Sequence, residues 1–175
     1  VTPTISIDEL LFAVILPREG TVAEDTVYLT RFPTVAIPTN DTDGFVTEGT
    51  GDNFFIVNKG EILTPQGRNI LRGVSRDYIF ELAKELGILC REVNIETYDV
   101  YQADEAFMTG TPFCILPTTS LNEIRIGNGK MGKVTNLLLD KWSKNVNLDI
   151  KQQIIDYGKE VSNLNKNAPS PYQFS

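Results

Sequence analysis

The stretch that decides the fold runs from residue 48 to residue 76 and begins with EGTGDN (residues 48–53). Two apolar runs follow, FFIV (54–57) and EILT (61–64), separated by a short Asn-Lys-Gly segment (58–60). Short apolar runs on either side of a turn that ends in glycine are typical of a β-hairpin. The stretch therefore predicts a glycine turn followed by a tight hairpin.

The same stretch ends with LRGVSR (71–76), which leads into a predicted helix. Ser75 can act as its N-cap, apolar residues between 78 and 86 share one face, and Gly87 stands where a left-handed C-terminal residue is favoured. A helix start offers unpaired N–H groups, and Gly73 has no Cβ to keep a ligand away. The segment predicts a cup for a phosphate group, although an ordinary capped surface helix has the same pattern.

Composition limits the class of protein. The 175 residues, of which 41% are hydrophobic, fit one domain with a real core. The net charge of −7 argues against nucleic acid or an anionic membrane as a partner. No apolar run approaches a membrane span and no leader pattern is present, so we expect a cytoplasmic protein. Cys90 and Cys114 lie in apolar, strand-like surroundings and are expected to be free thiols in a reducing compartment.

The chain contains no histidine. This excludes Ser-His and Cys-His nucleophiles and most transition-metal sites, so we predict no metal site. Chemistry must come from carboxylates, hydroxyls, lysine or a cofactor.

The remaining pattern predicts strands interleaved with a few helices, without regular βαβ alternation. Such an order favours an irregular α/β or α+β sheet with helices packed outside. The expected strands are residues 34–38, 93–97, 106–109, 113–117 and 123–126, with a helical turn over 101–105. One late helix is expected to bury Val134, Leu137, Leu138 and Trp142, and a second, capped by Asp149 and Gln152, to bury Ile150, Ile154, Ile155 and Val161.

Several of these motifs, taken in order, resemble the class IV pyridoxal-phosphate-dependent aminotransferases, and most closely the branched-chain amino-acid aminotransferases. They are the segments 48–55, 63–65, 71–76, 103–111 and 127–129. The resemblance covers roughly residues 34–147 and only the family's C-terminal half. It implies the large C-terminal domain of the D-amino-acid aminotransferase-like fold.

The resemblance also implies a division of the chain. Residues 34–164 are expected to form the cofactor-binding domain, and residues 165–175 a polar tail. Residues 1–33 show no resemblance and are expected to contain strands.

The resemblance implies roles for five cofactor-binding residues. A glutamate at the position of Glu48 pairs with the pyridine nitrogen of pyridoxal 5'-phosphate, and a carboxylate there keeps the ring protonated so that it can draw electrons from the substrate. Leu71 matches the residue that packs against the ring. Val74 and Ser75 match the phosphate cup, and Thr111 matches a second hydroxyl donor to the phosphate.

Substrate binding matches the family less well. Thr111 and Pro112 stand where backbone N–H groups contact the substrate carboxylate, but proline has no N–H to donate. The family's Schiff-base lysine precedes the glutamate by some tens of residues, whereas the first lysine here is Lys59. No catalytic residue is therefore assigned. Asn53 and Thr64 are interpreted as structural, as is the neighbouring carboxylate pair Asp104 and Glu105.

The function implied is transamination of an amino acid, most closely a branched-chain one, to its 2-oxo acid with 2-oxoglutarate as acceptor, in a homodimer. Because the lysine is absent, we expect the chain to be inactive alone. Two alternatives stay open: a non-catalytic protein that binds a phosphate-bearing ligand or a protein partner, and a lyase of the aminodeoxychorismate type.

Overall fold

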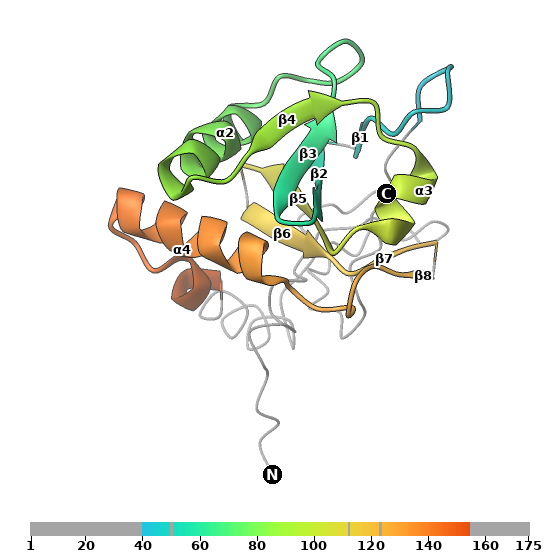
Figure 1. The fold of residues 1–175 in the computed structure, drawn as a ribbon. Coiled ribbons are helices and arrows are strands. Elements are labelled where there is room, and N and C mark those ends of the chain that lie inside the picture. The colour runs from blue at the N-terminus through green and yellow to red at the C-terminus, as the bar shows by residue number, and fades with distance from the viewer. Residues whose placement is uncertain (1–39, 50, 112, 123, 155–175) are drawn as a thin grey trace, which may run out of the picture.

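The computed structural model describes residues 40–49, 51–111, 113–122 and 124–154. The predictions for residues 1–33, the strand at 34–38, Pro112, the later part of the second late helix, with Ile155 and Val161, and the tail at 165–175 lie outside the described residues. The described part is a mixed α/β fold with a six-stranded sheet (Figure 1). Its elements are β1 (Glu48–Gly49), β2 (Asp52–Asn58), β3 (Glu61–Pro65), α2 (Val74–Leu86), β4 (Cys90–Val93), α3 (Thr97–Gln102), β5 (Glu105–Gly110), β6 (Cys114–Thr118), β7 (Ser120–Leu121), β8 (Ile124–Arg125) and α4 (Lys133–Val146).

The strands of the main sheet run in the order β4-β3-β2-β5-β6, and β1 pairs with β2. Strands β2 and β3 form the predicted hairpin, turning through Lys59 and Gly60 with φ values of 52° and 80°. Positive φ at both central residues matches the twist of a two-residue hairpin turn. The Lys59 N–H also donates to Oδ2 of Asp104 at 2.7 Å, which ties the turn to the segment before β5.

Helix α2 connects two parallel strands, β3 and β4. It ends at Gly87, which has the left-handed φ of 68° that the sequence predicts. Because the helix begins after β3 ends, its N-terminus lies beyond the carboxyl end of that strand. Ligands of α/β sheets commonly bind at such strand ends.

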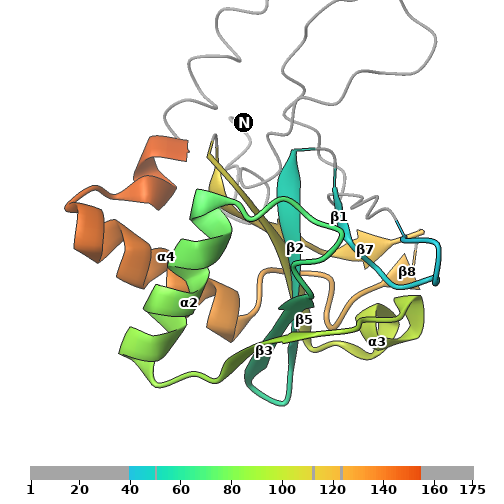
Figure 2. The same ribbon diagram turned by 90° about the horizontal axis from the view of Figure 1, so that it is seen from above.

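The hydrophobic core covers both faces of the sheet. Helices α2 and α4 lie side by side on one face, and α3 lies on the other side (Figures 1 and 2). The rings of Tyr78 and Trp142 meet edge to face between α2 and α4, with centroids 4.8 Å apart. Under the helices, Phe55 of β2 and Phe107 of β5 are fully buried and stack at 4.9 Å.

The register of β2 with β5 places three residue pairs on this same face. Phe55 lies opposite Phe107, so the alternation of side chains puts two further pairs on the helix-covered side, Asn53 opposite Thr109 and Val57 opposite Glu105. The aromatic stack therefore has a polar pair at one end and a buried glutamate at the other.

Two predicted elements are shifted. The strand expected over 93–97 is β4, three residues earlier, because Gly87 lets the chain turn quickly into register with β3. The helical turn expected over 101–105 is α3, which begins at Thr97. Glu96 and Asp99 form a reciprocal capping box there, which fixes the helix start.

The buried face of α4 also differs from the prediction. Leu138 is buried and Val134 and Trp142 pack against the core, but Leu137 is 38% exposed and Leu139 is buried instead. The helix is rotated because Thr135, one turn earlier, is held inward by Glu105. Asp149 accepts the predicted capping bond from the Gln152 N–H at 2.9 Å.

Both cysteines are free and half-buried. Burial raises the pKa of the Cys90 thiol to about 12, and burial also raises the pKa of Cys114. Neither is therefore a thiolate nucleophile near neutral pH. None of the described helices is both long enough and apolar enough to span a bilayer.

Candidate functional site

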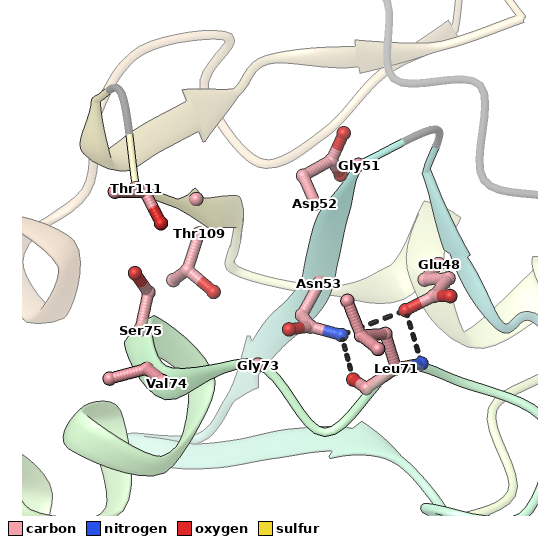
Figure 3. A pocket seen from close by; sticks show the side chains of 11 residues that line it. Glu48, Gly51, Asp52, Asn53, Leu71, Gly73, Val74, Ser75, Thr109 and Thr111 are labelled. Carbon is pink, nitrogen blue, oxygen red and sulfur yellow. Dashed lines mark hydrogen bonds between the residues drawn. The ribbon is translucent and has the colours of Figure 1, made fainter.

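A pocket opens where β1, β2, the start of α2 and the end of β5 meet (Figure 3). Its lining residues are Glu48, Gly51, Asp52, Asn53, Leu71, Gly73, Val74, Ser75, Thr109, Gly110 and Thr111. All five residues that the sequence assigns to cofactor binding are among them. The volume is about 140 Å³. Sites that enclose a small molecule usually measure roughly 300–1,000 Å³, so these walls surround only part of such a ligand.

Glu48 lies at one end of the pocket, where two hydrogen-bond donors hold its carboxylate. Its Oε2 accepts a hydrogen bond from the Leu71 N–H at 2.9 Å and another from Nδ2 of Asn53 at 2.9 Å. The same Asn53 amide donates to the Leu71 carbonyl at 2.7 Å. The network fixes the carboxylate between β1 and the loop before α2 (Figure 3).

The other end of the pocket is the start of α2. The N-cap is Gly73, which supplies no side-chain bond, so the prediction of Ser75 as N-cap is wrong. Ser75 already lies inside the first turn, because the chain enters the helix directly after its close approach to Asn53 at Gly73. Among the residues that the structure describes, none accepts a hydrogen bond from the N–H of Val74 or Ser75. Both residues line the pocket, so the positive end of the helix borders it.

Two threonine side chains complete this end. The hydroxyls of Ser75 and Thr111 point toward one another across the pocket (Figure 3). Thr109, only 1% exposed, lies between them and Asn53, and its Oγ1 has no hydrogen-bond partner within the described part of the chain. A buried hydroxyl without a partner is unfavourable unless a ligand or water pairs with it.

Thr109 is a pocket residue that sequence reasoning missed. One indication is in the sequence, because Thr109 is two residues before Thr111, and residues two apart lie on the same face of a strand. The other is its position directly opposite Asn53 in the register of β2 and β5. An aligned pair cannot be recognised, however, until the strand pairing is known.

Asp52 is the second pocket residue that was missed. Burial, and secondarily the charge of Glu48, raises its pKa above the ordinary value, although the Gly49 N–H bonds to its carboxylate and acts in the opposite direction. Its Oδ1 is buried without a partner among the described residues. The pocket thus has two carboxylates on its β1–β2 side and hydrogen-bond donors on its α2 side.

Two apolar pocket residues are largely uncovered. Leu71 is 70% exposed and Val74 is 86% exposed. Their exposure agrees with walls that enclose only part of a ligand.

The profile of the family described as amino-transferase class IV matches residues 33–121. The branched-chain-amino-acid aminotransferase of Escherichia coli is 44% identical over 96 residues, covering 54% of this chain and 31% of its own. The corresponding protein of Pseudomonas aeruginosa is 42% identical over 98 residues, covering 56% and 32%. The chain thus spans about a third of the length of these curated relatives.

Solved structures agree with this similarity. The E. coli branched-chain amino acid aminotransferase superposes with a TM-score of 0.57 at 41% identity, covering 58% of this chain and 34% of that one. A second, from T.th., solved with pyridoxamine 5'-phosphate, has a TM-score of 0.58 at 34% identity and covers 61% and 36%.

Proposed function

Because the chain belongs to the class IV aminotransferase family, we propose that it is the cofactor-binding part of a pyridoxal-phosphate-dependent branched-chain amino-acid aminotransferase. The proposed reaction passes the amino group of a branched-chain amino acid to 2-oxoglutarate. The observation that carries the proposal is the pocket with opposite chemistry at its two ends, a fixed carboxylate at Glu48 and open N–H groups at Val74 and Ser75.

The residues present fit a phosphorylated pyridine. In the proposal, the N–H groups of Val74 and Ser75 and the Ser75 and Thr111 hydroxyls hold the phosphate. The Thr109 hydroxyl, which has no partner among the described residues, favours an acceptor at this place. Glu48 holds a proton on the ring nitrogen, and Leu71 covers the ring. When bound, pyridoxal phosphate supplies the electron sink for the substrate Cα.

Catalysis needs a lysine that these residues do not provide at the family's position, since none precedes Glu48. We therefore propose that residues 1–175 alone bind the cofactor but do not turn over substrate. A substrate-carboxylate role for Thr111 and Pro112 and a homodimer also belong to the proposal. The assignment of residues 34–164 as the cofactor-binding domain is also part of the proposal.

Ligand binding tests the proposal on the chain itself. Pyridoxine 5'-phosphate, which cannot form a Schiff base, is titrated by fluorescence against the wild type and Glu48→Gln. We expect the wild type to bind it more tightly than inorganic phosphate, and Glu48→Gln to lose at least about tenfold for the ring ligand but little for phosphate. Equal binding of both ligands by the wild type would favour the non-catalytic phosphate-binding alternative. No binding would contradict the proposal.

Turnover is tested on the whole reading frame that contains these residues. We expect glutamate formation from leucine, isoleucine or valine with 2-oxoglutarate if that frame supplies a lysine before Glu48. Pyruvate release from a chorismate-derived amine instead would identify the lyase alternative.

A further inference from the structure

Asn53 contacts both ends of the pocket at once. It lies on β2, where it is 4% exposed. Its Nδ2 donates to Glu48 Oε2 at 2.9 Å and to the Leu71 carbonyl at 2.7 Å, as Figure 3 shows. Its Oδ1 faces Gly73, the N-cap of α2. One buried amide thus joins the carboxylate end to the helix start.

Gly73 is a glycine for steric reasons and not for conformational ones. Its φ of −73° and ψ of 144° are ordinary extended backbone that any residue adopts. A Cβ added there would nevertheless collide with Oδ1 of Asn53, while its contacts with Asn53 Cγ at 3.6 Å and Arg76 Cβ at 3.9 Å would be ordinary. The side-chain carbonyl oxygen of Asn53 is therefore sufficient to exclude a side chain at position 73.

We propose that Asn53 is a positioning residue that couples the two ends of the pocket, holding Glu48 through its NH₂ group and the start of α2 through its contact with Gly73. The identity of the ligand rests on the proposed function, but the coupling is a property of the chain. It assigns to Asn53 a role beyond the structural one that the sequence suggests.

The coupling matters because of where Glu48 lies. The residue belongs to the two-residue strand β1, next to a turn in which Gly51 has a φ of 91°. Such a short strand does not fix a carboxylate by itself, whereas Asn53 pairs with Glu48 on one side and with Thr109 on the other. A rigid ligand that contacts both ends needs their spacing held to roughly 0.5 Å.

A double-mutant cycle tests the coupling. The variants are Gly73→Ala, Asn53→Ala and the double variant, with Gly67→Ala as the matched control. A methyl group at position 67 would meet chiefly the flexible Arg72 side chain, at 3.2 Å. We expect Gly73→Ala to weaken pyridoxine 5'-phosphate about tenfold or more in the wild type but less than about twofold in the Asn53→Ala background. An equal loss in both backgrounds would overturn the coupling.

If Asn53→Ala does not fold, Asn53→Ser replaces it, because a serine side chain also ends short of Gly73. Nuclear magnetic resonance of the ligand-free chain supplies a second readout. Gly73→Ala should move both the Asn53 side-chain amide and the Leu71 backbone amide signals, because the displaced Asn53 releases its partners. Gly67→Ala should move neither. Unmoved signals in Gly73→Ala would also overturn the proposal.

The two hypotheses fail in different ways. A wild type that binds no pyridoxine 5'-phosphate contradicts the proposed function, and the resonance measurement then still decides the coupling. Normal ligand binding by the wild type, together with additive losses in the cycle, leaves the function standing and removes Asn53 as the coupling residue.

Discussion

The two long helices begin with the same kind of backbone but in different chemical surroundings. Both α2 and α4 follow a glycine with extended backbone, Gly73 and Gly132, and neither glycine supplies a side-chain cap. In both, a Cβ would collide with a polar side chain from the sheet, Asn53 at the first and Glu105 at the second. The difference between the two starts lies in what that polar side chain offers.

At α4 the sheet supplies an anion. The Glu105 carboxylate accepts the Val134 N–H at 2.8 Å, the Thr135 N–H at 2.9 Å and the Thr135 hydroxyl at 2.7 Å. At α2 the corresponding donors have no acceptor among the described residues, and the nearby Thr109 hydroxyl is also unpaired. The comparison teaches that this fold satisfies the start of α4 internally, whereas the start of α2 has no acceptor among the described residues and is where the proposed phosphate would bind.

The largest expected effect is at the internally satisfied start. Glu105→Ala should lower the free energy of unfolding by about 3 kcal/mol, because it leaves two N–H groups and a hydroxyl without an acceptor in a buried place. Urea denaturation measures the loss. Glu105→Gln keeps one acceptor oxygen and should lose roughly half as much. A loss below about 1 kcal/mol for Glu105→Ala would show that water replaces the carboxylate and would break the comparison.

The next effect is at the open start and concerns binding. Thr109→Val should weaken pyridoxine 5'-phosphate about five- to tenfold, because the valine keeps the shape and removes a donor. Thr118→Val is the matched control, since Thr118 is 3% exposed and its hydroxyl is equally unpaired within the described part of the chain, but it does not line the pocket. Fluorescence titration compares the two. Equal effects of both substitutions would mean that Thr109 acts only through packing.

The sequence predicts the elements around the start of α2 better than it predicts the residue that caps the helix. The hairpin, the extent of α2 and its Gly87 end follow from local periodicity and turn chemistry. The assignment of Ser75 as N-cap fails because serine is favoured at a cap in general, whereas here the chain must enter the helix at its approach to Asn53. That approach joins residues 20 positions apart and cannot be predicted from local pattern.

The face of α4 shows the same limit. The prediction of a core-facing position is confirmed for Val134, Leu138 and Trp142. It is wrong for Leu137, because the bond from Thr135 to Glu105 turns Thr135 inward. A polar contact from another strand therefore decided between two helical faces of similar hydrophobicity. The interpretation of Glu105 as structural agrees with its bonds to the start of α4, yet those partners lie 29 and 30 residues away and cannot be identified from local pattern.

A smaller effect separates the first turns of the two helices. Thr135→Val should cost about 1 kcal/mol of stability, because it removes one bond to a buried carboxylate. Ser75→Ala should leave stability within about 0.5 kcal/mol, since its hydroxyl has no partner among the described residues, while it weakens the phosphate ligand. Thermal unfolding with and without pyridoxine 5'-phosphate measures the change in stability and the change in ligand binding for each variant. The reverse order of stabilities would contradict the comparison.

The smallest effect concerns the carboxylate beside the open start. The pKa of Asp52 is raised, first by burial and then by the charge of Glu48, so the folded state holds this proton more tightly than the unfolded one. Its contribution to stability is complete below the unfolded pKa near 3.8 and is lost as pH rises through the folded pKa. Asp52→Asn avoids that loss and still offers an oxygen to the Gly49 N–H.

The variant Asp52→Asn should therefore match the wild type near pH 3 and exceed it at pH 7, by less than about 1 kcal/mol because solvent screens a partly exposed charge. Asp77→Asn is the control, because Asp77 is exposed in the first turn of α2 and its charge favours the helix, so its loss should not stabilise at pH 7. Urea denaturation at both pH values gives the difference in unfolding free energy between each of the two variants and the wild type. A gain for Asp52→Asn that is equal at pH 3 and pH 7 would show that side-chain packing, and not ionisation, distinguishes the pocket end of the molecule from the closed start of α4.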